Sequence, residues 1–294
     1  DNDNSPEIAA MIGASVALAL SDPGSEGKRL GQMGMMETLG VICGTGSVWL
    51  LFDKTAPQYR VGFLCAAGLA GLVAVIFSRM HMPDLHEPRQ RIVFDRRFKL
   101  YYFLEFLHGA RKQIFLTFGP WVLIKVYHQP TTGMAGLLMT AAIIGIAFKP
   151  LAGLAIDRFG ERAVMMADAI ILIVVCLGYG YAMVIMPDPE HARILACSCF
   201  VADNLLFALG TARVVYLSRL ANSSQEITST MSMGVTINHS VSMTIPLVAG
   251  AIWINFGYER VFLSAAGLAV FTAIMSTRVP GKRARQQSTA AVCP

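Results

Sequence analysis

The chain has 294 residues, of which 54% are hydrophobic and only 15% are charged, and its mean hydropathy is +0.54. Soluble domains are about 45–50% apolar and about 25% charged, so this composition argues against a soluble enzyme or binding domain. The net charge of +5 does not indicate a nucleic-acid-binding protein, because the lysines and arginines gather in short loops and form no basic face interleaved with aromatic residues. We therefore expect a protein whose partner is membrane lipid.

Long apolar blocks define the expected elements, because a transmembrane helix needs about 20 consecutive apolar residues. Eight blocks are long enough, in chain order 29–52, 59–79, 100–126, 133–156, 163–186, 192–218, 227–254 and 259–277. An earlier block, 8–20, is too short and is interpreted as the end of a helix whose beginning is missing. The predicted fold class is an all-α polytopic membrane helix bundle with eight complete transmembrane helices and one partial helix. The chain begins at Asp1 without a signal-peptide pattern, so we expect an N-terminally truncated sequence.

The loops between these blocks differ in charge in strict alternation. Short cytoplasmic loops retain lysine and arginine, so their distribution predicts orientation. One set of alternate loops carries fifteen such residues and the other set five. This bias predicts a cytoplasmic C-terminus, with residues 279–294 as a cytoplasmic tail.

The longest polar connection, residues 81–99, is basic and contains proline. It follows two complete blocks and precedes six. We interpret it as a cytoplasmic linker between residues 1–80, the remainder of an N-terminal bundle, and residues 100–278, a six-helix C-terminal bundle.

A charged turn, GLAIDRFGERA, joins the fourth and fifth blocks. Its distinctive members are Gly153, Asp157, Arg158, Gly160 and Arg162. Glycines permit a tight turn and close helix approach, the carboxylate can meet a neighbouring helix N-terminus, and the arginines can pair across the loop. The simpler interpretation is a cytoplasmic turn that happens to contain glycine and aspartate.

This turn resembles the G-x-x-x-D-R-x-G-x-R signature of the major facilitator superfamily. The resemblance implies twelve helices in two halves of six, with the signature after the second helix of a half. Here the signature follows the second block after the linker, and four helices follow it, as in a C-terminal half. Helices one to three and most of helix four would then be missing. The resemblance implies a secondary transporter in a bacterial inner membrane, with the charged turn as part of a conformational switch.

Polar residues interrupt the block 100–126 near its centre: Glu105, His108, Arg111 and Lys112. A charge at mid-membrane costs at least about 2.5–3.5 kcal/mol on insertion scales, so each is a candidate for handling substrate or ions. At about 100° per residue, three of the four share one helix face and Arg111 borders them. An internal ion pair that only fixes helix packing is the alternative.

Two later blocks also contain polar residues at mid-depth. Asp203 and Asn204 lie in block 192–218, where the aspartate could carry a proton or balance a nearby arginine or lysine. Asn238 and His239 lie in block 227–254 before Pro246, which predicts a kink or break. Broken, polar helices at the midplane are where carriers bind their substrates, although interhelical hydrogen bonding is the alternative role.

Glu37 lies on the first complete block, where it could border a central cavity. Lys149 lies just inside the cytoplasmic end of its block. We interpret it as a snorkelling residue that marks the membrane interface.

The predicted function is alternating-access transport of a small organic solute, coupled to protons through an acid such as Glu37, Glu105 or Asp203. Arg111 and Lys112 together favour an anionic solute. If the carboxylates neutralise them, a drug or lipophilic-cation exporter is the alternative.

A membrane enzyme and a receptor built on a carrier fold are the other classes of protein to consider. The sequence has no H-E-x-x-H, P-loop or G-x-S-x-G motif, so we expect no catalytic residues. The mid-membrane charges argue against a non-transporting receptor. Cys197 and Cys199 point to different sides of a helix, so we expect no metal site and no cofactor.

Overall fold

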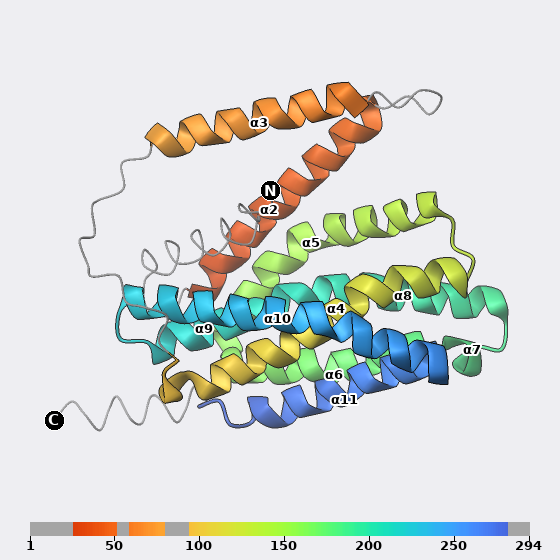
Figure 1. The fold of residues 1–294 in the computed structure, drawn as a ribbon. Helices are drawn as coiled ribbons and strands as arrows, with labels where there is room; N and C mark the ends of the chain where they lie inside the picture. The colour runs from red at the N-terminus through yellow and green to blue at the C-terminus, as the bar shows by residue number, and fades with distance from the viewer. Residues whose placement is uncertain (1–25, 52–58, 80–93, 282–294) are drawn as a thin grey trace.

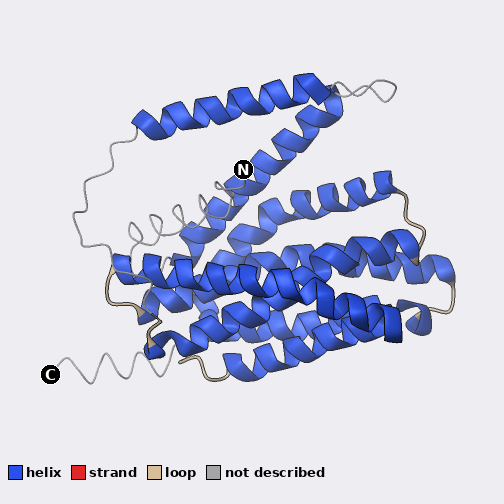
Figure 2. Ribbon diagram, viewed as in Figure 1, coloured by secondary structure: helices blue, strands red, loops and turns tan. Residues whose placement is uncertain are grey.

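The computed structural model describes residues 26–51, 59–79 and 94–281. These residues are almost entirely helical and contain no strand (Figure 2). The predicted partial helix 8–20, most of the linker 81–99 and nearly all of the tail 279–294 lie outside the described residues. The described helices are α2 (Glu26–Leu51), α3 (Tyr59–Arg79), η1 (Arg96–Phe98), α4 (Lys99–Lys125), α5 (Thr131–Phe159), α6 (Glu161–Gly180), α7 (Ala182–Ile185), α8 (Pro189–Leu206), η2 (Phe207–Gly210), α9 (Thr211–Leu220), α10 (Ser224–Phe256) and α11 (Tyr258–Ser276).

Each of the eight apolar blocks corresponds to a helix or a short series of helices. The block 192–218 is not one regular helix, because the 3₁₀ segment η2 separates α8 from α9. Of the kink or break expected at Pro246, the break is not present: α10 continues through this proline as one helix of 33 residues.

Five helical stretches of the described chain are long and apolar enough to cross a membrane. They are Gly136–Phe159, Glu161–Gly180, Pro189–Leu220, Gln225–Phe256 and Tyr258–Ser276. α4 is not among these five although it has 27 residues, because His108, Arg111, Lys112 and Gln113 lower the hydropathy at its centre. The structure therefore indicates a helical membrane protein, while the predicted count of eight complete spans and one partial span stays a prediction.

Large apolar side chains cover the outside of the bundle. Val174 on α6 is 66% exposed, and Leu247 and Ile254 on α10 are 76% and 83% exposed. Apolar patches of this extent on a protein surface mark contact with another apolar phase. Lipid supplies that phase here, so these faces are the ones that the bilayer would cover.

The helices α4 to α11 pack as one bundle (Figure 1). α4 contacts α10 and α11, α11 contacts α6, and α8 contacts both α5 and α6. α2 lies against α5, whereas α3 is farther from the bundle in Figure 1. α8 is thus placed between α5, which contacts α2, and α6, which contacts α11.

An aromatic cluster anchors α4, α6 and α11 to one another. Phe115, Tyr179 and Phe262 are fully buried, and their ring centroids are 4.7–6.0 Å apart. The Tyr179 hydroxyl donates a hydrogen bond to the carbonyl of Gly119 at 2.5 Å. The cluster holds α4 and α6 in register, so polar side chains from these two helices meet inside the bundle.

Candidate functional site

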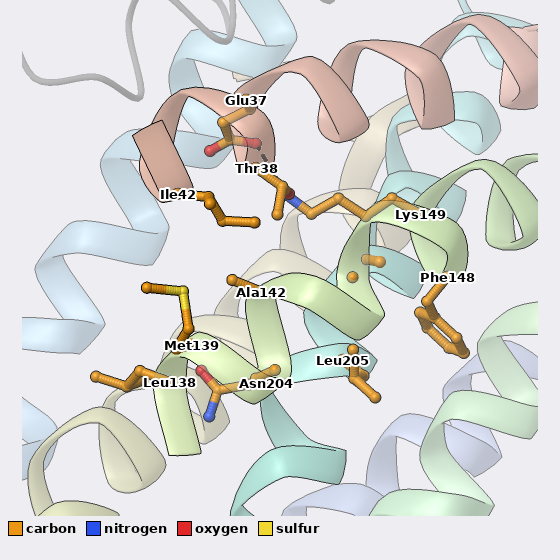
Figure 3. Close-up of a pocket in the computed structure, with 13 residues that line it drawn as sticks. Glu37, Thr38, Ile42, Leu138, Met139, Ala142, Phe148, Lys149, Asn204 and Leu205 are labelled. Carbon is orange, nitrogen blue, oxygen red and sulfur yellow. Dashed lines mark hydrogen bonds and ion pairs between the residues drawn. The ribbon is translucent and has the colours of Figure 1, made fainter. Parts of the chain in front are cut away.

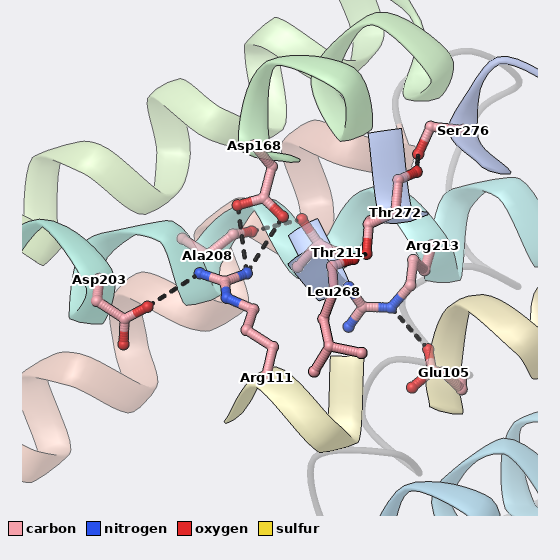
Figure 4. Close-up of polar contacts among 10 residues, drawn as sticks. All are labelled: Glu105, Arg111, Asp168, Asp203, Ala208, Thr211, Arg213, Leu268, Thr272 and Ser276. Carbon is pink, nitrogen blue, oxygen red and sulfur yellow. Dashed lines mark hydrogen bonds and ion pairs between the residues drawn. The ribbon is translucent and has the colours of Figure 1, made fainter. Parts of the chain in front are cut away.

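A buried arginine on α4 joins three helices. Its Nη1 lies 3.3 and 3.2 Å from the two carboxylate oxygens of Asp168 on α6, and its Nη2 lies 3.2 Å from Oδ1 of Asp203 on α8 (Figure 4). The side chains of Arg111, Asp168 and Asp203 are 5%, 8% and 2% exposed. Charges this deeply buried require partners, and here one cation is shared by two anions.

A second, largely buried ion pair involves Glu105, which lies six residues, or nearly two turns, before Arg111 on α4. Arg213 on α9 donates to Glu105 through Nε at 2.9 Å (Figure 4). Phe207 in η2 lies beside Arg111 and His108, with its ring 5.3 Å from the Arg111 guanidinium and edge-on to the His108 ring at 6.0 Å. We call the side chains of Glu105, Arg111, Asp168, Asp203 and Arg213 the ion network. A polar space of about 20 Å³ lies beside it, lined by His108 among others, and this volume suits one water molecule.

A larger cavity of about 370 Å³ lies between α2, α5 and the end of α8 (Figure 3). Its polar lining residues are Glu37, Thr38, Lys149 and Asn204, and the other lining residues are Ile42, Leu138, Met139, Ala141, Ala142, Gly145, Phe148, Leu205 and Ala208. Binding sites for small molecules typically measure about 300–1,000 Å³ and combine an apolar lining with few polar groups. The cavity has the size and composition of such a site.

An ion pair closes one side of this cavity. Nζ of Lys149 lies 3.2 Å from Oε2 of Glu37, with side chains 26% and 66% exposed (Figure 3). The interpretation of Lys149 as only an interface marker is therefore incomplete. The Lys149 ammonium on α5 lies opposite the Glu37 carboxylate on α2, so this ion pair connects the two helices.

The cavity and the ion network adjoin different faces of the α8–η2 segment, about 100° apart around the helix. Asn204 and Ala208 line the cavity, whereas Asp203 and Phe207 face Arg111. The change from α-helix to 3₁₀-helix occurs between these residues, at Leu206 and Phe207. Mid-helix 3₁₀ segments often mark hinges, so a shift of this segment would alter both sites.

The charged turn brings α2 and α5 together at one end. Oδ2 of Asp157 accepts a hydrogen bond from the backbone N–H of Lys28 in the first turn of α2, at 2.7 Å. A carboxylate is favourable there because the N-terminus of a helix is electropositive. A Cβ on Gly31 would lie 2.7 Å from the Lys149 carbonyl oxygen and 3.3 Å from Cα of Gly153. The two backbones thus approach too closely for a larger residue.

The remaining members of the turn have separate roles. Gly160 links α5 to α6 with φ of 88° and ψ of 156°, a conformation that only glycine adopts readily. The Arg158 guanidinium lies over the ring of Phe159 at 5.7 Å, and Arg162 lies close to Gly281 after α11.

The structure brings most of the predicted site residues to these two places, but not all of them. Glu105, Arg111 and Asp203 belong to the ion network and His108 adjoins it, while Glu37 and Asn204 line the cavity. Lys112 and His239 are half-buried. Asn238 is buried at the α4–α10 contact, where a Cβ on Gly109 would lie 2.8 Å from its carbonyl oxygen.

Sequence reasoning missed Asp168. It lies within the apolar block 163–186, so the cost of burying a charge, which selected Asp203, would have selected it too.

Comparison of the sequence with models of known protein families gives no match, and comparison with curated proteins gives none either.

Proposed function

We propose that the protein is a secondary active transporter of the major facilitator type, which moves a small amphipathic organic solute by alternating access and couples that movement to protons. The observation that carries the proposal is the cavity of about 370 Å³ between α2 and α5, separated only by α8–η2 from the buried ion network. A bacterial inner membrane and a cytoplasmic C-terminus are part of the same proposal.

The contacts between α2 and α5 support an alternating-access role. Asp157 meets the start of α2, Gly31 fits against the α5 backbone, and Glu37 pairs with Lys149. The first two contacts lie at the end of α2 where the charged turn is found. Separating α2 from α5 would break all three contacts and open the cavity towards the end of α2 that contacts the charged turn.

The charges around the cavity bear on the class of solute. The hypothesis of an organic anion depended on Arg111 and Lys112, but Arg111 is offset by two carboxylates. The Lys149 ammonium is likewise paired, while the Glu37 carboxylate is 66% exposed. This pairing favours a neutral or cationic amphipathic solute, so a lipophilic-cation exporter is the second candidate function.

Thermal stability of the purified protein with a panel of organic anions, neutral amphiphiles and lipophilic cations tests the proposal. A ligand at about 100 times its Kd stabilises the folded state by about 2.7 kcal/mol. Two α5 alanines provide a matched pair: Ala142 lines the cavity, whereas Ala147 is exposed on the same helix.

We expect a cationic or neutral compound to stabilise the wild type and Ala147→Phe, and to have little effect on Ala142→Phe, because a phenyl ring fills part of the cavity. Equal stabilisation of both variants would place the ligand elsewhere. Stabilisation by anions alone would contradict the assignment of solute class.

A further inference from the structure

The ion network carries an unequal number of positive and negative groups. Two arginines, Arg111 and Arg213, face three carboxylates, Glu105, Asp168 and Asp203. With every group ionised, these five side chains carry a net charge of −1; Lys112, whose field also reaches His108, is only half-buried and is not counted in the network. An uncompensated charge in a buried site is costly, so the network is neutral when it binds one proton.

The groups around the network limit where that proton can reside. Arg213 is within hydrogen-bonding distance of Glu105, so that pair is neutral by itself. The His108 imidazole lies in the fields of Arg111, Lys112 and Arg213, and these three cations oppose another positive charge there. The proton is therefore left to the two carboxylates that share Arg111.

The two carboxylates do not share Arg111 equally. Asp168 receives two contacts from Nη1 and also lies in the field of Arg213. Asp203 receives one contact, from Nη2, and within the part of the chain that the structure describes its further charged neighbour is the like-charged Asp168. The buried thiol of Cys176 on α6, which also lies near Asp203, adds no positive charge. Asp203 is thus the carboxylate that is less compensated.

From this geometry we infer that Asp203, Arg111 and Asp168 form a single proton-binding site, with the proton on Asp203. The biological role of this site rests on the proposed transport function. The existence of the site depends only on the balance of charges in the ion network. Protonation weakens the contact of Asp203 with Nη2, and Arg111 then pairs with Asp168 alone. α8 loses its ionic contact with α4 shortly before η2, next to Asn204 and Ala208, which line the cavity.

Infrared difference spectroscopy over a pH series tests this site directly in the full chain reconstituted in lipid. A buried protonated carboxyl group has a C=O stretching band that an ionised carboxylate lacks. We expect one such band in the wild type, titrating as one proton. Its absence across the series would overturn the inference without the use of any variant.

Variants then test the sharing of the arginine. Asp203→Asn removes the proton-carrying group, and Asp168→Asn leaves one carboxylate for one arginine, so both are expected to lose the band. Glu190→Gln, an exposed position on α8, is the control that retains it. Because the two aspartates lie on different helices, one variant still tests the inference if the other does not fold. Persistence of the band in either folded variant would contradict the shared site.

Transport is a separate measurement. A titrating band that requires both aspartates supports the proton site, whether or not protons enter vesicles together with a solute. If no proton movement accompanies the solute, the proposed coupling fails and the proton site stands.

Discussion

Replacement of Arg111 by methionine would leave two carboxylates buried beside an apolar side chain. Arg111 is 5% exposed and is the arginine in contact with both Asp168 and Asp203, at 3.2–3.3 Å. Removing one partner of a buried ion pair costs about 3–5 kcal/mol, because the other charge stays buried without compensation. We expect Arg111→Met to lower the free energy of unfolding by about this amount at neutral pH.

The matched control is Arg193→Met on α8. Arg193 pairs with Glu190 at 3.1 Å, but the two side chains are 39% and 70% exposed. Exposed pairs contribute about 0–1 kcal/mol. Unfolding in mixed micelles, followed by circular dichroism, gives the two free energies under the same conditions.

Two further results follow from the same reasoning. At acidic pH, Arg111→Met should lose less of its free energy of unfolding, because protonation removes the uncompensated charges of Asp168 and Asp203. The triple variant in which both aspartates are also changed to asparagine should recover much of the stability, because a buried ion pair can often be replaced as a unit. An Arg111→Met loss no larger than that of Arg193→Met, or no recovery in the triple variant, would refute the role assigned to the network.

Three substitutions test other parts of the fold by the same unfolding measurement. Gly31→Ala places a Cβ 2.7 Å from the α5 backbone and should lower the free energy of unfolding by about 1–3 kcal/mol. Its control, Gly40→Ala, has open space around it and should be neutral or stabilising. Equal effects of the two variants would contradict the close α2–α5 contact. Gly160→Ala should cost about 1–3 kcal/mol because of its φ of 88°, and no loss would contradict that turn geometry. Tyr179→Phe removes a hydrogen bond between helices and should cost about 0.6–1.7 kcal/mol, while an unchanged value would mean that the bond contributes nothing.

The helices could be predicted from the sequence because membrane solvent imposes a simple rule. An apolar block of about 20 residues must satisfy its backbone hydrogen bonds internally, so it forms a helix. The ends of most blocks agree with the observed helices to within a few residues. The 3₁₀ segment at Phe207–Gly210 could not be predicted this way, because the block 192–218 remains apolar through it.

The residue types of the site were predictable, but their partners were not. The cost of burying a charge identified Arg111 and Asp203 individually, and the same argument applied to Asp168 would have completed the set. Pairing depends on which helices are neighbours. Glu37 and Lys149 are 112 positions apart and meet only because α2 packs on α5. The position of Lys149 in the sequence therefore predicted a residue at the membrane interface and not this ion pair.

The central claim is that one molecule holds a solute cavity and a proton site that act together. The most direct measurement is proton movement into vesicles that contain the full chain and a pH-sensitive dye, after addition of the solute identified by thermal stabilisation. The account predicts solute-dependent acidification with wild-type protein, and solute binding without acidification with Asp203→Asn. Acidification of equal size in Asp203→Asn vesicles, or none in wild-type vesicles that take up the solute, would contradict it.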